Sequence, residues 1–445
     1  MAAQRVIINS DLNVNPEECI VPLASSTTTA GTLKLRGQPE GAQPIRITLN
    51  DCLVCTGCVT SAEEVFLREL NTDALERAIR EAPGRPLTFS FSLASSLSMA
   101  NVLLQSYDLE ALASILSMGL SRKIAALVGV APTIQILFEV QSQALSAAMQ
   151  VQQLMKHLEG VPPSGPQTPT PTIVTDCPAV RMFISKRNST LAPLILPVAS
   201  QMEVSGVNHE GLFVSIQPCQ DRKLEQFRGA SIDICLTTQE LLVFLGEYLD
   251  LNDRLASSSD SGLYRYPFAP LLAAYLHQKG VLCCSFEALF SSTNPGQLAW
   301  TKRGNGLDSF TLPLHPTGFY DTIMVYRCHG YHNLQNVVRR LSSMCTEPRT
   351  LYVFEMHACP HGCFGGACIA GDDQHPLASV ASGCSAEADL HDSGLVRALF
   401  DDPSILATIE NIPLLESVIR TDQEYLSPEE IAVRKGGVRL QDLGW

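Results

Sequence analysis

The chain has 445 residues, of which 45% are hydrophobic and 17% are charged, and its 31 basic and 45 acidic residues give a formal net charge of −14. This length and apolar content allow two or three folded domains with large buried cores. The negative charge argues against a nucleic-acid-binding surface, which would need clustered Lys and Arg, and the sequence has no basic stretch of that kind.

The first residues carry no pattern of a targeting segment. Residues 1–9 contain one Arg and no long apolar core. No later apolar run reaches the roughly 18–20 residues that a membrane span needs. We therefore expect a cytoplasmic protein that binds neither membranes nor nucleic acid.

Fifteen cysteines are many for a cytoplasmic protein, where structural disulfides are rare and metal or redox chemistry is the better explanation. Cys52, Cys55 and Cys58 form a Cys-x2-Cys-x2-Cys run, in which three thiolates on one tight turn can bind three corners of a cubane iron–sulfur cluster. The fourth Cys-Pro pair of bacterial ferredoxins is absent, which favours one cluster in this region. Its remaining ligand must come from elsewhere, and Cys19 is the only other cysteine nearby. Zinc, which also accepts four thiolates, is the alternative metal.

Two short helices are expected after this run. Ser61-x-x-Glu64 is a capping-box pattern that predicts a helix start, and a second helix is predicted over residues 73–81. Residues 82–86 contain two prolines and a glycine, which cannot continue a helix. The sequence thus predicts an N-terminal iron–sulfur (ferredoxin-like) domain at 1–84 and a larger domain at 85–425.

The larger domain alternates helical and strand patterns, which predicts an α/β fold. Residues 109–159 are rich in Ala, Leu, Gln and Met at helical spacing and predict several packed helices, and a Pro-rich surface loop follows at 161–171. The short β-rich runs beyond position 172 are 173–174, 212–216, 232–236, 281–284, 323–326 and 351–354.

Three cysteines follow predicted strands directly. Cys177 follows the run at 173–174, Cys219 the run at 212–216, and Cys359 the run at 351–354. Ligand sites in open α/β sheets lie at the carboxyl ends of strands, so the three thiols could converge on one metal centre. The alternative is that they are buried structural cysteines, because free Cys is among the most buried residue types.

The C-terminal part is predicted to hold an acidic solvated loop at 371–393 and a helical stretch at 395–418. Ser427-Pro428-Glu429-Glu430 is a further helix start, with Ser427 as N-cap and Pro428 at the first helical position. We expect residues 426–445 to form a C-terminal helix and tail.

Four segments resemble known proteins. Residues 49–63 (LNDCLVCTGCVTSAE) closely resemble the hydrogenase-like cytosolic iron–sulfur assembly factors, also called nuclear prelamin A recognition factor-like proteins. The segments TDCP at 175–178, QPCQDRKLE at 217–225 and EMHACPHGC at 355–363 resemble the iron-only hydrogenase core in the same order. The resemblance implies a small N-terminal iron–sulfur domain and a hydrogenase-like core of two α/β lobes around a cluster site.

The resemblance also implies two [4Fe–4S] clusters. The first would be bound by Cys19, Cys52, Cys55 and Cys58. The second, at the place of the hydrogenase active centre, would be bound by Cys177, Cys219, Cys359 and Cys363.

Other residues near these motifs have open roles. His357 and His361 flank Cys359 and allow a mixed Cys/His zinc site, although we expect His357 to point away from Cys359. The pair Gly365-Gly366 either lets the backbone approach the cluster closely or forms a plain turn. Cysteines interpreted as structural are Cys235, Cys283 and Cys284, and those left unassigned are Cys368 and Cys384.

The sequence departs from hydrogenases at four positions. Asp176 stands where hydrogenases have a proton-relaying Cys, and Val180 stands where they have a Trp. Gln217 replaces a Met, and Arg222 replaces the Lys that contacts the diiron ligands. Hydrogen turnover is therefore not expected, and no catalytic residue is assigned.

The resemblance implies a non-catalytic component of cytosolic and nuclear iron–sulfur protein assembly, an adaptor between the early scaffold and the targeting complex. The alternatives are an iron-only hydrogenase or another iron–sulfur oxidoreductase, and a zinc-binding interaction protein. Family members and clients of the targeting complex end on an aromatic residue after an aliphatic-acidic pair. Here the ending is Leu443-Gly444-Trp445, so Trp445 is a candidate anchor for partner binding, although Gly444 departs from that pattern. The alternative is that Trp445 packs on its own domain.

Overall fold

The computed structural model describes residues 71–159, 171–207, 209, 211–227, 232–253, 268–290, 298–304, 306–315, 319–360, 362–370 and 404–415. The chain forms two compact units, Met1–Glu64 and Val65–Trp445, and every described residue belongs to the second. The predictions for the four N-terminal cysteines, for the loop at 161–171 except its last residue, for the loop at 371–393 and for Trp445 lie outside the described residues. The predicted domain boundaries at 84 and 425 remain predictions.

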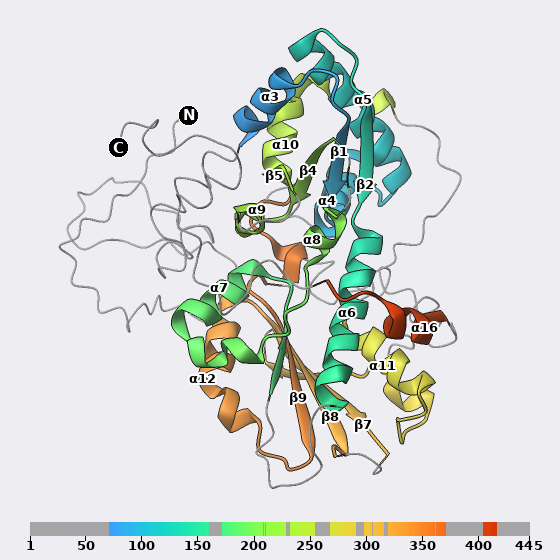
Figure 1. The fold of residues 1–445 in the computed structure, drawn as a ribbon, viewed down its shortest axis with the longest axis vertical. Helices are drawn as coiled ribbons and strands as arrows, with labels where there is room; N and C mark the ends of the chain where they lie inside the picture. The colour runs from blue at the N-terminus through green and yellow to red at the C-terminus, as the bar shows by residue number, and fades with distance from the viewer. Residues whose placement is uncertain are drawn as a thin grey trace, which may run out of the picture. The chain divides into compact units, whose positions relative to one another are not determined.

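The first lobe of the described unit is built on a parallel four-stranded sheet (Figure 1). In spatial order its strands are β2 (Ile134–Phe138), β1 (Leu87–Phe91), β4 (Leu212–Gln217) and β5 (Ile234–Thr237). Around it pack helices α3 (Thr72–Glu81), α4 (Leu93–Leu104), α5 (Leu109–Val128) and α10 (Thr238–Leu245). Every residue of β1, β4 and β5 is buried, as expected for parallel strands that are covered on both faces.

The second lobe contains a mixed five-stranded sheet. Its strands in spatial order are β3 (Thr172–Val174), β9 (Thr350–His357), β8 (Thr322–His329), β7 (Leu307–Pro313) and β6 (Thr301–Gly304). The strands β3, β9 and β8 are parallel, whereas β7 and β6 are antiparallel to their neighbours. Its helices are α6 (Val140–Glu159), α7 (Pro178–Arg187), α11 (Phe268–Gln278), α12 (Tyr331–Met344) and α16 (Ser404–Asn411).

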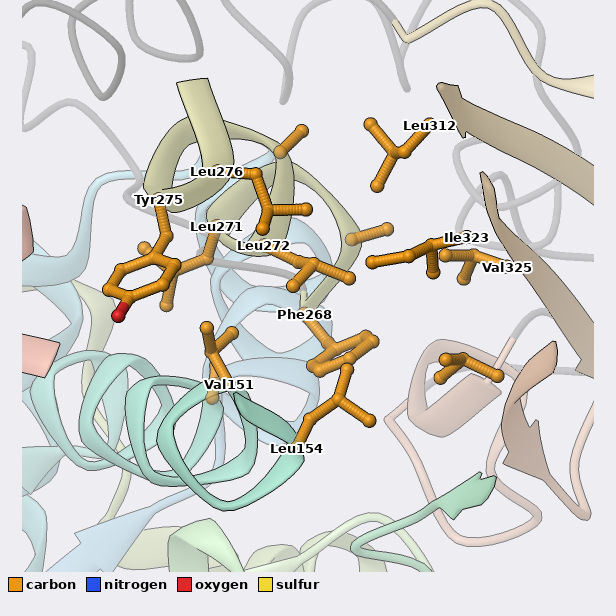
Figure 2. Packing of buried hydrophobic residues seen from close by; sticks show 14 of the residues in the cluster. Val151, Leu154, Phe268, Leu271, Leu272, Tyr275, Leu276, Leu312, Ile323 and Val325 are labelled. Atoms are coloured by element: carbon orange, nitrogen blue, oxygen red, sulfur yellow. The ribbon is translucent and has the colours of Figure 1, made fainter. Parts of the chain in front are cut away.

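The core of the second lobe lies between this sheet and two helices (Figure 2). Val151 and Leu154 of α6 and Phe268 and Leu272 of α11 pack toward Ile323 and neighbouring side chains of β7 and β8. Helices α7 and α12 lie to the other side of the strands (Figure 1). The predicted α/β architecture with two lobes is therefore confirmed for the described part of the chain.

The helix α6 connects the two lobes. It begins two residues after β2, and Val140 at its start packs against the core of the first lobe. Leu154, near its other end, is fully buried in the core of the second lobe. One continuous helix therefore contributes to both hydrophobic cores.

Several sequence predictions of elements are corrected by the structure. Residues 109–159 are not only helical, because the strand β2 separates α5 from α6. Residues 281–284 form no strand and contribute only the isolated bridge between Leu282 and Leu314. The strand β6 was not predicted because its sequence, Thr-Lys-Arg-Gly, is exposed throughout and carries no apolar alternation.

The helix α5 also corrects the expectation that no apolar segment is long enough to cross a membrane. Among the described residues it is the one helix that is long and apolar enough to cross a membrane. In its most apolar stretch, 39% of the residues are buried inside the protein. Arg122 and Lys123 interrupt its apolar run. In the structure α5 packs against α4, β2 and α3, with Leu112 and Leu116 fully buried.

The start of α5 provides a test of the fold. Asp108 is the N-cap residue, and its carboxylate accepts a hydrogen bond from the backbone N–H of Ala111 at 2.9 Å. Replacing Asp108 with Ala is expected to lower the free energy of unfolding by about 1 kcal/mol, because a backbone donor loses its partner. Denaturant unfolding followed by circular dichroism measures the change. Asp108→Asn keeps the acceptor and should stay near wild type, so equal losses in both variants would contradict this role.

Candidate metal centre

Three strands place a cysteine just past their carboxyl ends. The strands β3, β4 and β9 end at Val174, Gln217 and His357, two or three residues before Cys177, Cys219 and Cys359 respectively. Cys219 thus comes from the first lobe, whereas Cys177 and Cys359 come from the second. Cys363 follows in the short 3-10 helix Gly362–Gly365.

Local hydrogen bonds fix the turn that carries Cys177. This residue is the N-cap of α7, and Pro178 occupies the first helical turn, where the missing N–H costs nothing. The hydroxyl of Thr175 accepts from the backbone N–H of Cys177 at 3.1 Å and donates to the carbonyl of Met356 at 2.7 Å. The turn after β3 is therefore tied to the end of β9.

The four thiols lie close enough to influence one another's ionisation. Burial and then the charge of Cys363 raise the pKa of Cys177 to about 12. Burial raises the pKa of Cys219 well above its ordinary value, and the charges of Asp221 and of the other three thiols add to this shift. Burial and then the charges of Cys177 and Cys363 raise the pKa of Cys359 in the same way. Because a thiolate would be buried and would repel a neighbouring thiolate, Cys177, Cys219 and Cys359 favour the neutral thiol unless a positive centre binds them.

The loop after Cys359 packs against the loop that carries Cys219. The backbone N–H of Cys368 donates to the carbonyl of Pro218 at 2.9 Å. A Cβ on Gly365 would lie 1.8 Å from the carbonyl oxygen of Pro360, and one on Gly366 would lie 2.5 Å from that of Pro218. These two glycines are therefore required for the close approach of two backbone segments, and their role toward a cluster stays a prediction.

A buried guanidinium lies beside Cys363. Arg222 is 1% exposed, and its Nη2 lies 2.9 Å from Asp176 Oδ2 while its Nη1 lies 2.8 Å from Glu225 Oε1. The same Nη2 donates to the sulfur of Cys363 at 3.9 Å. Two carboxylates thus hold one cation against one of the four thiols.

His357 also influences this site. Its pKa is raised to about 10: burial acts to lower it, but interactions with Cys363 and Glu355 and the charge of Asp176 outweigh burial, and its Nε2 lies 3.8 Å from Glu355 Oε1. His357 Nδ1 lies 3.7 Å from Asp176 Oδ1, which is an ion-pair distance and too long for a hydrogen bond. Burial acts to raise the pKa of Cys363, but the interaction with His357 and the charge of Arg222 outweigh burial and lower it.

A second polar network lies behind Cys219. Gln217 Nε2 donates to both carboxylate oxygens of Glu139, at 3.0 and 3.2 Å, and Ser90 donates to Glu139 Oε1 at 3.0 Å. Burial raises the pKa of Glu139 despite these hydrogen bonds. The sequence interpretation missed Glu139 because it also missed β2, the strand that ends just before this residue. These hydrogen bonds stabilise the end of β4, two residues before Cys219.

The remaining residues singled out in the sequence are spread through the unit. Cys235 and Cys368 are buried, Cys283 is exposed, Cys284 is intermediate in exposure, and Val180 is buried in α7. His361 and Cys384 lie outside the described residues. In the described part of the chain, no three His, Cys, Asp or Glu side chains are grouped closely enough to hold a single metal ion.

Comparisons with known proteins place this geometry in context. Residues 131–367 match the protein family described as "Iron only hydrogenase large subunit, C-terminal domain". "Protein NAR1" of Arabidopsis thaliana is 26% identical over 73% of this chain and 73% of its own length. "Cytosolic Fe-S cluster assembly factor NAR1" of Saccharomyces cerevisiae (strain ATCC 204508 / S288c) is 22% identical over 84% of this chain and 87% of its own length.

A similar solved structure is a variant of the [FeFe]-hydrogenase HydA1 from Chlamydomonas reinhardtii. It is 17% identical in sequence, with a TM-score of 0.48. The match covers 79% of this chain and 96% of the hydrogenase chain.

Proposed function

Because the chain belongs to the family of the iron-only hydrogenase large subunit, C-terminal domain, we propose that it binds an iron–sulfur cluster through Cys177, Cys219, Cys359 and Cys363 and acts in cytosolic iron–sulfur cluster assembly. The Saccharomyces cerevisiae relative, which is named a cytosolic Fe-S cluster assembly factor, supports this role and a cytoplasmic location. The observation that supports the proposal is the placement of four free cysteines, three of them just past the ends of β3, β4 and β9 and the fourth in the loop that follows β9.

The donor set fits a cluster of several irons. All four cysteines are free thiols, and thiolates are the ligands that iron–sulfur clusters require. In a cubane each thiolate binds a different iron, so the sulfurs stand farther apart than the ligands of one zinc ion. The charges of Cys177, Cys359 and Cys363 affect the pKa of Cys219, but among the described residues the four thiols are not close enough together to coordinate one metal ion.

The residues around the thiols would orient the individual cysteines. The turn at Thr175 and the N-terminus of α7 orient Cys177, and the network of Glu139 and Gln217 steadies the strand end before Cys219. The close backbone contact at Gly365 positions the loop of Cys359 and Cys363. When bound, the cluster supplies an electron-accepting centre that can also be passed to another protein.

We further propose that the cluster is a [4Fe–4S] cluster and that a second one is bound by Cys19, Cys52, Cys55 and Cys58. In this proposal the chain is a non-catalytic adaptor between an early scaffold and a targeting complex. The assembly-factor names of the relatives favour such a role over hydrogen turnover. The tail Leu443-Gly444-Trp445 is the proposed contact for the targeting complex.

The test is the metal content of the protein purified without oxygen. Two [4Fe–4S] clusters correspond to about eight irons and eight sulfides per chain. Zinc in place of iron would overturn the proposal and favour a zinc-binding interaction protein. Hydrogen evolution from reduced viologen, with infrared bands of CO and cyanide, would instead establish a hydrogenase.

A further inference from the structure

The four proposed ligands differ in what surrounds their sulfurs. Burial raises the pKa of both Cys219 and Cys359. The charges of Asp221 and of the neighbouring thiols add to the shift at Cys219, and those of the neighbouring thiols add to the shift at Cys359. Among the charged groups that act on Cys177, Cys363 raises its pKa and Arg222 lowers it. Cys363 accepts a hydrogen bond from a cationic side chain, from Arg222 Nη2 to its sulfur at 3.9 Å, and the charge of His357 also lowers its pKa.

Arg222 is held in place more firmly than a surface arginine. Its two terminal nitrogens bind different carboxylates, Asp176 at 2.9 Å and Glu225 at 2.8 Å, so that the guanidinium plane is fixed. Glu225 is itself 2% exposed and accepts a hydrogen bond from the hydroxyl of Ser200 at 2.9 Å. A buried cation with this support keeps its position and its charge in every state of the site.

A fixed positive charge beside one sulfur changes the energy of an added electron. A hydrogen bond to a cluster sulfur withdraws electron density, and a nearby cation stabilises the reduced cluster, so both effects raise the reduction potential. In a buried site this influence is screened less than at the surface.

On the basis of the proposed cluster site, we propose that Arg222 is a positioning residue that donates to the Cys363 sulfur, raises the reduction potential of the cluster and makes the iron at Cys363 different from the other three. Asp176 and Glu225 serve to aim the guanidinium. A lysine could not replace it, because an ammonium group lacks the planar fork that reaches both carboxylates and the sulfur.

The test is a redox titration of the full-length, cluster-loaded protein, followed by electron paramagnetic resonance. Arg222→Gln should lower the ratio of reduced to oxidised cluster about tenfold at the wild-type midpoint, which corresponds to about 59 mV for a one-electron couple. The N-terminal cluster, whose midpoint should stay unchanged, is an internal control. Arg327→Gln removes a cation from a separate, partly buried ion pair with Asp308 and should move neither midpoint.

Equal shifts of both clusters, or no shift of either, would overturn the role of Arg222. If the Arg222→Gln variant loses its cluster, the Arg222→Lys variant is titrated instead. A midpoint of the second cluster that falls by less than about 59 mV supports the role of Arg222, and a midpoint equal to that of the wild type contradicts it. A wild-type protein without iron at Cys177, Cys219, Cys359 and Cys363 would refute the proposed function itself. If the wild-type protein contains the cluster but the Arg222→Gln variant has the same midpoint, only the inference about Arg222 is refuted.

Discussion

Replacing Cys359 with alanine is expected to remove one of two clusters and leave the other. The iron and sulfide content should fall from about eight of each to about four of each per chain. The reason is that Cys359 lies among four mutually repelling thiols, and three thiolates leave one iron without a protein ligand. Iron and sulfide analysis of the oxygen-free protein measures the change, and the spectroscopic signal that disappears identifies the second cluster.

Cys235 is the matched control for this substitution. It is also a buried cysteine: burial raises the pKa of its thiol, and the charged groups that act on it next are Lys223 and three glutamates. Cys235→Ala should therefore keep the full iron content. Equal iron losses in the two variants, or none in Cys359→Ala, would refute the assignment of Cys359 as a ligand.

Replacing Gly365 with alanine is expected to have an effect as large as the loss of a ligand. The added Cβ would lie 1.8 Å from the carbonyl oxygen of Pro360, and no side-chain rotation can relieve a clash with backbone. The loop must shift, which we expect to lower the free energy of unfolding by roughly 3 kcal/mol. Because the same loop carries Cys359 and Cys363, the second cluster should also be lost.

Thermal unfolding and iron analysis together test the Gly365 prediction. Gly304→Ala is the matched control, because a Cβ at that position meets no atom within 4 Å and the φ angle is ordinary. It should match wild type in both measurements. A Gly365→Ala protein with normal stability and normal iron would show that the backbone approach is not needed.

The sequence predicted the strands before Cys177, Cys219 and Cys359 because each contains consecutive apolar residues of β-branched or aromatic type. The predicted runs at 173–174, 212–216 and 351–354 lie within β3, β4 and β9, which are longer. The short strand β2 was missed because it is only partly buried and lies between two helices of 20 residues each. Local patterning identifies an element only when its own periodicity stands out from its neighbours.

The charged surroundings of Cys363 could not be read from the sequence. Asp176 and Arg222 were recognised singly, as departures from hydrogenases, but their ion pair joins residues 46 positions apart. Such a pairing depends on how the two lobes pack, which no local pattern reports. The predicted orientation of His357 concerned only Cys359, and its contact with Cys363 was missed.

The order of the cysteines along the chain has a consequence for biosynthesis. The cysteines at 177, 219, 359 and 363 come from both lobes, so the complete set exists only after the ribosome has released residue 363 and the two sheets have folded. The cysteines at 19, 52, 55 and 58 emerge much earlier. Because domains fold from the N-terminus during synthesis, the four ligands of the proposed N-terminal cluster are all present while the chain is still attached to the ribosome. The ligands of the proposed second cluster come together only after both lobes have been synthesised and folded.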